Sequence, residues 1–317
     1  MEPEGYKALK SVLSQDEMNI LEASQDNKYT GLSDADMQAL LKILESGGKE
    51  EIDPEAIEEE ILREQLRLRS LKLKNSDQYK MLDILKCMIE RVDHCNENDS
   101  ELTCYRHFAK LLDCLFKDTN LLLLDGEPAC IAVKEEMIAG QSLYPSSSGN
   151  VLSTCAIRKI DAIIAIEQNK ERVEFSTNEW KKNNASTTTA IKQQSKNLRS
   201  NLSILNQLER KFSIRTKDIL AVDFVGNLEK KEGVAVATLV EEMAVPTVKS
   251  ELERAPQTIN ALFMLKNHVL KLAEEVASKP KRSKLRGIVR CKQPLTAPCQ
   301  TPRVIFSPKL KKRKLDE

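Results

Sequence analysis

Three charged side chains, Asp161, Glu179 and Lys181, could act together if two neighbouring strands carry them. Glu179 and Lys181 flank the only tryptophan of the chain, Trp180, in the segment "STNEWKK". Side chains alternate along a strand, so Glu179 and Lys181 would point to one face and Trp180 to the other. Two carboxylates and one ammonium on a small area suit the binding of Mg²⁺ or Mn²⁺ and the activation of water for attack on a phosphodiester.

These residues would be positioned by two antiparallel strands with a helix before and a helix after them. The segments on either side of "EQNKE" are rich in Ile, Val and Phe and predict a hairpin. Before the hairpin, Ser100 can cap a helix over 101–116 whose apolar residues recur at helical spacing. After it, residues 184–212 predict a helix with Ile191, Leu198, Leu202, Leu205 and Leu208 on its buried face.

The remaining elements are read from periodicity and turn residues. Met81 to Val92 predicts a core helix capped by Ser76 or Asp77. "NLLLLDGEPACIAVK" predicts two short runs joined by a turn at Asp125-Gly126, hence a hairpin. "DILAVDFVGN" and "GVAVATLVEEMAVP" predict two strands joined by a turn at "NLEKKEG", and a last helix is expected over 252–277. Helices alternating with strands predict a mixed α/β or α+β layer architecture.

The chain resembles the PD-(D/E)XK, or restriction-endonuclease-like, superfamily of metal-dependent nucleases. The resemblance rests on a hairpin between two helices that carries Asp161, Glu179, Trp180 and Lys181. The resemblance covers residues 101–246 and implies a restriction-endonuclease-like core sheet flanked by helices. It implies Mg (or Mn) as cofactor, with Asp161 and Glu179 as metal ligands and Lys181 as the catalytic ammonium.

Two further parts of the family pattern have counterparts in this chain. Glu101, in the first turn of the helix before the hairpin, is similar in placement to an auxiliary carboxylate that would join the metal ligands and the catalytic set. Gln193, Gln194 or Lys196 would match the polar residue that the following helix often directs to the site. The chain departs from the pattern in having Ile160 where the family has a proline.

Each candidate also has a purely structural interpretation. Asp161 could be a solvent-exposed strand residue, and Glu179 with Lys181 a surface pair that contributes about 0.2–1 kcal/mol. Glu101 is also explained by the positive end of the helix dipole, which favours a carboxylate in a first turn. Trp180 is most simply a core residue.

Lys192, Lys196 and Arg199 lie at i, i+4 and i+7 and so share a side of the predicted helix with Gln193 nearby. These four residues are candidates for contacting nucleic acid, since a row of cations can follow a phosphate backbone. A solvated helix face is the ordinary alternative.

The net charge of +1 conceals a strong asymmetry. Residues 279–317 contain 13 Lys or Arg against 2 acidic residues, so an acidic body precedes a basic tail. Within the tail, Lys311, Lys312, Arg313 and Lys314 resemble a nuclear localisation signal, which predicts a nuclear import receptor as partner and the nucleus as location. A nonspecific nucleic-acid-binding tail is the rival interpretation.

Composition excludes several other classes. Eight cysteines occur without any CxxC spacing and with only three histidines, which gives little support to a zinc site. No apolar run approaches the ~20 residues that a membrane span needs, so no membrane partner is expected. The amino terminus has no basic segment followed by an apolar one, so we expect an intracellular protein with reduced thiols.

The sequence thus predicts three regions. Residues 1–75 form a polar, partly helical or disordered amino-terminal region, 76–277 a PD-(D/E)XK-like domain, and 278–317 a disordered basic tail. The expected function is metal-dependent hydrolysis of phosphodiester bonds in nucleic acid, DNA in preference to RNA, or that of a catalytically inactive derivative. The alternative is a non-enzymatic nuclear protein that binds partners or nucleic acid.

Overall fold

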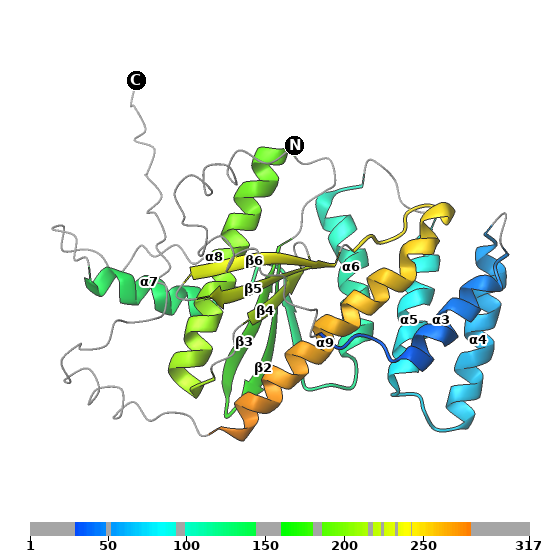
Figure 1. The fold of residues 1–317 in the computed structure, drawn as a ribbon, viewed down its shortest axis with the longest axis horizontal. Coiled ribbons are helices and arrows are strands. Elements are labelled where there is room, and N and C mark those ends of the chain that lie inside the picture. The colour runs from blue at the N-terminus through cyan, green and yellow to red at the C-terminus, as the bar shows by residue number, and fades with distance from the viewer. Residues whose placement is uncertain are drawn as a thin grey trace.

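The computed structural model describes a mixed α+β protein, which confirms the coarse fold class expected from the sequence (Figure 1). The described residues are 29–48, 52–92, 99–143, 160–179, 186–214, 218–222, 225–231, 234–241 and 243–279. The basic tail and the predicted localisation signal at Lys311, Lys312, Arg313 and Lys314 lie outside them, as do all residues before Tyr29.

Four helices form the first part of the described chain, namely α3 (Asp34–Glu45), α4 (Pro54–Ser70), α5 (Asp77–Ile89) and α6 (Glu101–Phe116). Each begins at a residue whose side chain accepts a hydrogen bond from a backbone N–H of the first turn, and these capping residues are Ser33, Asp53, Ser76 and Ser100. Such caps satisfy donors that the helix itself leaves unpaired. The predicted starts at Ser76 and Ser100 are therefore confirmed.

The first sheet has the order β1-β2-β3 and is antiparallel, with strands β1 (Leu122–Asp125), β2 (Ala162–Gln168) and β3 (Glu171–Asn178). The predicted hairpin is confirmed as β2 and β3. Its two-residue turn, Asn169 and Lys170, has φ of 53° and 62°. Positive φ at both central residues is the hairpin turn that matches the twist of the strands.

The second sheet, with the order β4-β5-β6, corrects one prediction. Its strands are β4 (Asp218–Val222), β5 (Val225–Lys231) and β6 (Val234–Glu241), so the residues "NLEKK" form most of a strand and not a turn. This strand pairs with β4 on one side and β6 on the other. Hydrogen-bonded pairing on both edges of β5 overrides the weak strand propensity of Asn, Glu and Lys.

A second correction concerns the residues after β1. The strand pairs with β2 rather than with the run that follows it, and that run begins helix α7 (Ile131–Leu143) instead of a second strand. The reason is a tertiary contact: the buried carboxylate of Glu174 on β3 accepts the first backbone N–H groups of this helix. No local sequence pattern in this run predicts its contact with Glu174.

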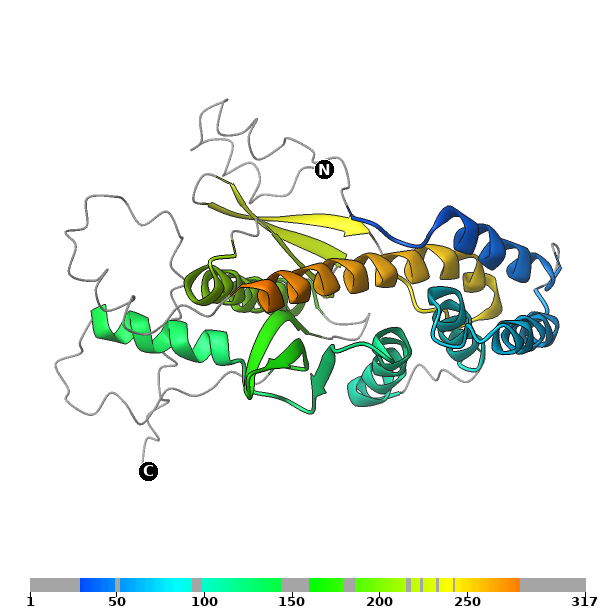
Figure 2. The ribbon, with the colours of Figure 1, turned by 90° about the horizontal axis from the view of Figure 1, so that it is seen from below.

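Two long helices connect the two sheets. Helix α8 (Thr187–Phe212) follows β3 and contacts β3, β4 and α7, and helix α9 (Ala255–Ser278), preceded by a 3₁₀ turn (Lys249–Arg254), contacts β3 and β4. Figure 2 shows the second sheet on one side of α9 and the first sheet on the other. The predicted helices at 184–212 and 252–277 are thereby confirmed in position.

The amino-terminal helices share the core of the rest of the molecule. Ile57, Ile61 and Leu68 of α4 are fully buried, so this helix is more than the solvated or partly disordered segment that its charges suggested. One cluster of apolar side chains runs from Leu40 on α3 to Val276 on α9. The predicted boundary near residue 75 therefore does not separate two cores. Within the described part of the chain, no helix has the length and apolar character required to cross a membrane.

Candidate functional site

Glu179 follows the last residue of β3 and is the most informative of the predicted site residues. Its side chain is only 4% exposed, yet both carboxylate oxygens have partners on α8. Gln193 Nε2 donates a hydrogen bond to Oε2 at 2.6 Å, and the ammonium of Lys196 forms an ion pair with Oε1. Glu179 is therefore a buried carboxylate held in place by two long side chains of the helix that follows the hairpin.

Asp161 immediately precedes β2 and is half-buried. At this end of the hairpin Ala162 pairs with Asn178 and Ile163 with Thr177. Continuing this antiparallel register by one residue on each strand places Asp161 opposite Glu179. Residues opposite one another in such a pair share a face, with Cβ atoms about 4.5–5.5 Å apart. If the register continues in this way beyond the last paired residues, Ala162 and Asn178, the two carboxylates that the sequence paired would lie side by side.

Tyr105 on α6 places a helix close to the same end of the sheet. It packs with Ala109 of its own helix and with Ala162, the first residue of β2. Burial raises the pKa of the Tyr105 hydroxyl, and the negative charges of Asp125 and Asp161 raise it further. These charges act on Tyr105 only because the end of β1 and the start of β2 both lie close to α6.

The structure does not describe the side chains of three predicted residues, Glu101, Trp180 and Lys181. Glu101 is the first residue of α6, one turn before Tyr105, but its side chain is not among those described. Trp180 and Lys181 lie outside the described residues. The proposed catalytic ammonium and auxiliary carboxylate therefore remain predictions.

The residues predicted to form a basic side of α8 lie in different surroundings. Lys192 is exposed, whereas Lys196 is partly buried and its ammonium contacts Glu179. Arg199 donates from Nε to the carbonyl of Ser195 one turn earlier. Gln193, predicted to contact nucleic acid, contacts Glu179. Gln193 and Lys196, from the family pattern, are thus directed to the predicted site.

Sequence reasoning missed a group of buried asparagines that join α8 to the end of β3. Asn197 and Asn201 are 2% and 0% exposed and both bind Thr177, two residues before Glu179. Asn178 Oδ1 accepts a hydrogen bond from the backbone N–H of Val222 on β4, at 2.7 Å. Asparagine is a poor helix former, so two of them one turn apart in a helix were the available signal.

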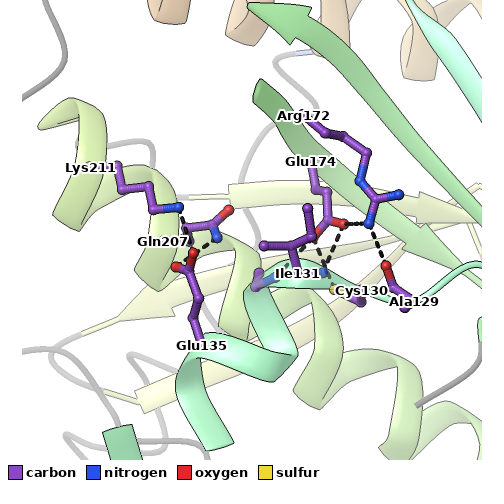
Figure 3. Close-up of polar contacts among 9 residues, drawn as sticks. Ala129, Cys130, Ile131, Glu135, Arg172, Glu174, Gln207 and Lys211 are labelled. Carbon is purple, nitrogen blue, oxygen red and sulfur yellow. Dashed lines mark hydrogen bonds and ion pairs between the residues drawn. The ribbon is translucent and has the colours of Figure 1, made fainter. Parts of the chain in front are cut away.

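A second buried carboxylate on β3 was also missed. Glu174 is fully buried and accepts from the backbone N–H groups of Ile131 and Ala132, from the Cys130 thiol, and from Arg172 (Figure 3). A glutamate within an apolar strand is the sequence signal that could have indicated this buried carboxylate. This carboxylate caps the amino terminus of α7, where the helix dipole favours negative charge.

Figure 3 also shows a link between α7 and α8. Glu135 accepts from Gln207 at 2.9 Å and pairs with the ammonium of Lys211 at 2.6 Å. Because α8 also carries Gln193 and Lys196, this link helps to fix the helix that contacts Glu179.

The donor set at the end of the hairpin suits a hard cation. Mg²⁺ prefers carboxylate oxygens, is commonly held by one or two of them, and keeps several waters. Asp161 and Glu179 would supply two carboxylates, which fits that requirement. Within the described ranges, no group of three or more His, Cys, Asp or Glu side chains is placed to hold a metal ion.

Comparison with known proteins adds no assignment: no family model, no curated protein and no solved structure matches this chain.

Proposed function

We propose that this protein is a Mg²⁺-dependent nuclease, or a derivative of one, with its site at the open end of the β2–β3 hairpin. The observation that carries the proposal is the buried Glu179 that two α8 side chains hold in place, at the end of the hairpin where Asp161 adjoins β2. The surrounding elements support it, because α6, the hairpin and α8 follow in the order that the PD-(D/E)XK resemblance implies.

The roles of the residues follow from their chemistry. When bound, Mg²⁺ (or Mn²⁺) would neutralise charge on the phosphodiester and acidify a water molecule. Asp161 and Glu179 would hold it, with Glu101 as an auxiliary ligand. Lys181 would orient the attacking water or accept its proton, so that a P–O bond forms to water while the bond to the departing nucleoside oxygen breaks. Gln193 and Lys196 fix the rotamer of Glu179.

DNA is the preferred substrate of this proposal, and Lys192 and Arg199 of α8 would lie along its backbone. Each phosphate contact adds salt dependence to binding because condensed cations are released from the nucleic acid. The tail residues Lys311, Lys312, Arg313 and Lys314 would direct the protein to the nucleus through an import receptor. Removal of residues 309–317 should abolish nuclear accumulation of a fluorescent fusion, and unchanged accumulation would contradict that role.

The test of activity is cleavage of supercoiled, linear and single-stranded DNA and of RNA, with Mg²⁺ or Mn²⁺. The wild-type chain is compared with Lys181→Ala and Asp161→Asn, and with Lys42→Ala, at an exposed lysine of α3, as the control. We expect metal-dependent cleavage that both site substitutions reduce by at least about 100-fold, the usual contribution of a positioned acid or base. Equal or metal-independent cleavage by all variants would disprove catalysis at this site.

One observation favours the non-enzymatic alternative. Both oxygens of Glu179 already have protein partners, which is also what a purely structural carboxylate would show. In that case the protein would bind nucleic acid or nuclear partners without cleaving. Binding of DNA without any cleavage, unchanged by Asp161→Asn, is the result that this alternative predicts.

A further inference from the structure

We infer that Asn197 and Asn201 are positioning residues, which set the end of β3 so that Glu179 meets its partners in one geometry. The inference rests on the proposed function, since it concerns the carboxylate that would hold the metal. It is carried by a row of three side-chain amides on α8, Gln193, Asn197 and Asn201, which we call the amide row.

Asn201 takes the place of a neighbouring strand. Its Oδ1 accepts from the backbone N–H of Thr177 at 2.8 Å, and its Nδ2 donates to the carbonyl of the same residue at 2.9 Å. One side chain thereby satisfies both backbone groups on the edge of β3 that faces away from β2. Buried backbone groups need such partners. The contact is two-pronged, so it fixes direction as well as distance.

Asn197 holds the side chain of the same residue. The hydroxyl of Thr177 donates to Asn197 Oδ1 at 2.8 Å, and Asn201 Nδ2 also approaches the carbonyl of Asn197 at 3.1 Å. Thr177 is fully buried, as is Asn201, and Asn197 is 2% exposed. A buried network in which every member has a partner is rigid and specifies one arrangement.

The spacing of Gln193 and Asn197 matches the spacing of the strand, whereas Asn201 binds the same residue as Asn197, Thr177. Gln193, Asn197 and Asn201 are four residues apart and lie on one helix face, and four residues advance a helix by about 6 Å. Thr177 and Glu179 are two residues apart, and two residues advance a strand by about 6.6 Å. Gln193 therefore reaches Glu179 when Asn197 reaches Thr177, as the contacts show.

A helix that packed on β3 through apolar residues alone could slide along it. Apolar contacts have no direction, whereas the hydrogen bonds of Asn201 hold at one position of α8. One turn of sliding would move Gln193 and Lys196 away from Glu179. Asn197 and Asn201 are poor helix formers and so lower the stability of α8. We attribute their burial to the hydrogen bonds that fix the position of α8 along β3.

The test substitutes each amide without changing the carboxylate. Asn201→Leu and Asn197→Ala are compared with Asn206→Leu, which alters another buried asparagine of α8 outside the row. Urea unfolding first establishes that each variant is folded under the assay conditions. Two measurements follow: hydrogen exchange of the Thr177 amide by NMR, and the affinity for Mn²⁺ by calorimetry together with cleavage rate.

We expect Asn201→Leu to increase exchange of the Thr177 amide by about tenfold or more, since its acceptor is lost. Affinity for Mn²⁺ and cleavage should fall by about tenfold, since a displaced ligand binds less well. Asn206→Leu should change neither. Wild-type exchange and Mn²⁺ affinity in a folded Asn201→Leu variant would overturn the inference, and Asn197→Ala decides the question if Asn201→Leu does not fold.

Different results would contradict the proposed nuclease function and the proposed positioning role of Asn197 and Asn201. If the wild-type chain neither binds Mn²⁺ nor cleaves, the proposed function is wrong, while the exchange of the Thr177 amide still decides whether Asn201 fixes the strand. If the wild type binds Mn²⁺ and the amide variants bind it equally well, the metal site stands and the positioning role is wrong.

Discussion

Two buried glutamates at the β2–β3 hairpin, Glu174 and Glu179, differ in the kind of donor that holds them. Glu174 accepts from two backbone N–H groups at the start of α7, in addition to a thiol and Arg172. The partners of Glu179 include the flexible side chains of Gln193 and Lys196. A bulge between Ile164 and Ala165 adjusts the register so that both carboxylates share one face of the sheet.

The difference separates a structural carboxylate from one that can exchange its partners. Backbone donors at a helix terminus cannot move without unfolding the helix, so Glu174 is committed to capping α7. A lysine or glutamine side chain can rotate away at modest cost and leave its carboxylate to another cation. Glu179 is thus buried and has two side-chain partners that can be displaced, as the proposed metal-binding role would need.

The largest expected effect is the loss of stability on removing the Glu174 charge. Glu174→Gln removes the carboxylate partner of Arg172, which keeps the carbonyl of Ala129, and turns an amide toward backbone donors. This change should cost about 3–5 kcal/mol. Glu179→Gln should cost about 1 kcal/mol, because the ammonium of Lys196 can move into water. Urea unfolding of both variants measures the difference, and equal costs would remove the distinction between the two carboxylates.

A smaller effect is expected at Lys196. Lys196→Met leaves the Glu179 carboxylate with Gln193 as its described donor, which should cost about 1–3 kcal/mol. Lys192→Met, the matched change one turn earlier at an exposed lysine, should lie within about 0.5 kcal/mol of the wild type. If Glu179 binds metal, millimolar Mg²⁺ should restore part of the loss in Lys196→Met only. The same unfolding free energy for both variants would show that Lys196 does not hold Glu179.

The smallest effect is a difference in thiol reactivity that reports the Glu174 environment. Burial raises the pKa of Cys130, and the negative charge of Glu174 raises it further. The pKa of Cys87 is lowered by its hydrogen bond with Cys114 and by Lys110. Because the thiolate is the reactive form, iodoacetamide at pH 8 should label Cys87 about tenfold faster than Cys130.

Mass spectrometry of the labelled peptides measures both rates. Glu179→Gln should leave the labelling of Cys130 unchanged, since Glu179 does not contact it. Faster labelling of Cys130 in that variant would mean that the two glutamates belong to one coupled network.

The hairpin and most helices were predictable because their signals are local. Alternating β-formers on either side of a polar turn specified β2 and β3, and serine caps at Ser76 and Ser100 specified two helix starts. Three features were not predictable in this way. The strand β5 depends on two neighbours, helix α7 depends on Glu174, and the amide row depends on contacts with Thr177.

The features of the candidate site likewise fall into those that local sequence predicts and those that depend on tertiary contacts. The sequence by itself determined the residue types, the existence of the hairpin and the alternation that turns Glu179 and Lys181 to one face, because strand alternation is a property of the chain alone. The register of the two strands, with its bulge between Ile164 and Ala165, came from the structure. Only the tertiary structure decided that Glu179 is buried, that Gln193 and Lys196 hold it, and that Asn197 and Asn201 fix the helix which carries them. The physical reason is that burial and side-chain hydrogen bonds depend on which distant segments pack together.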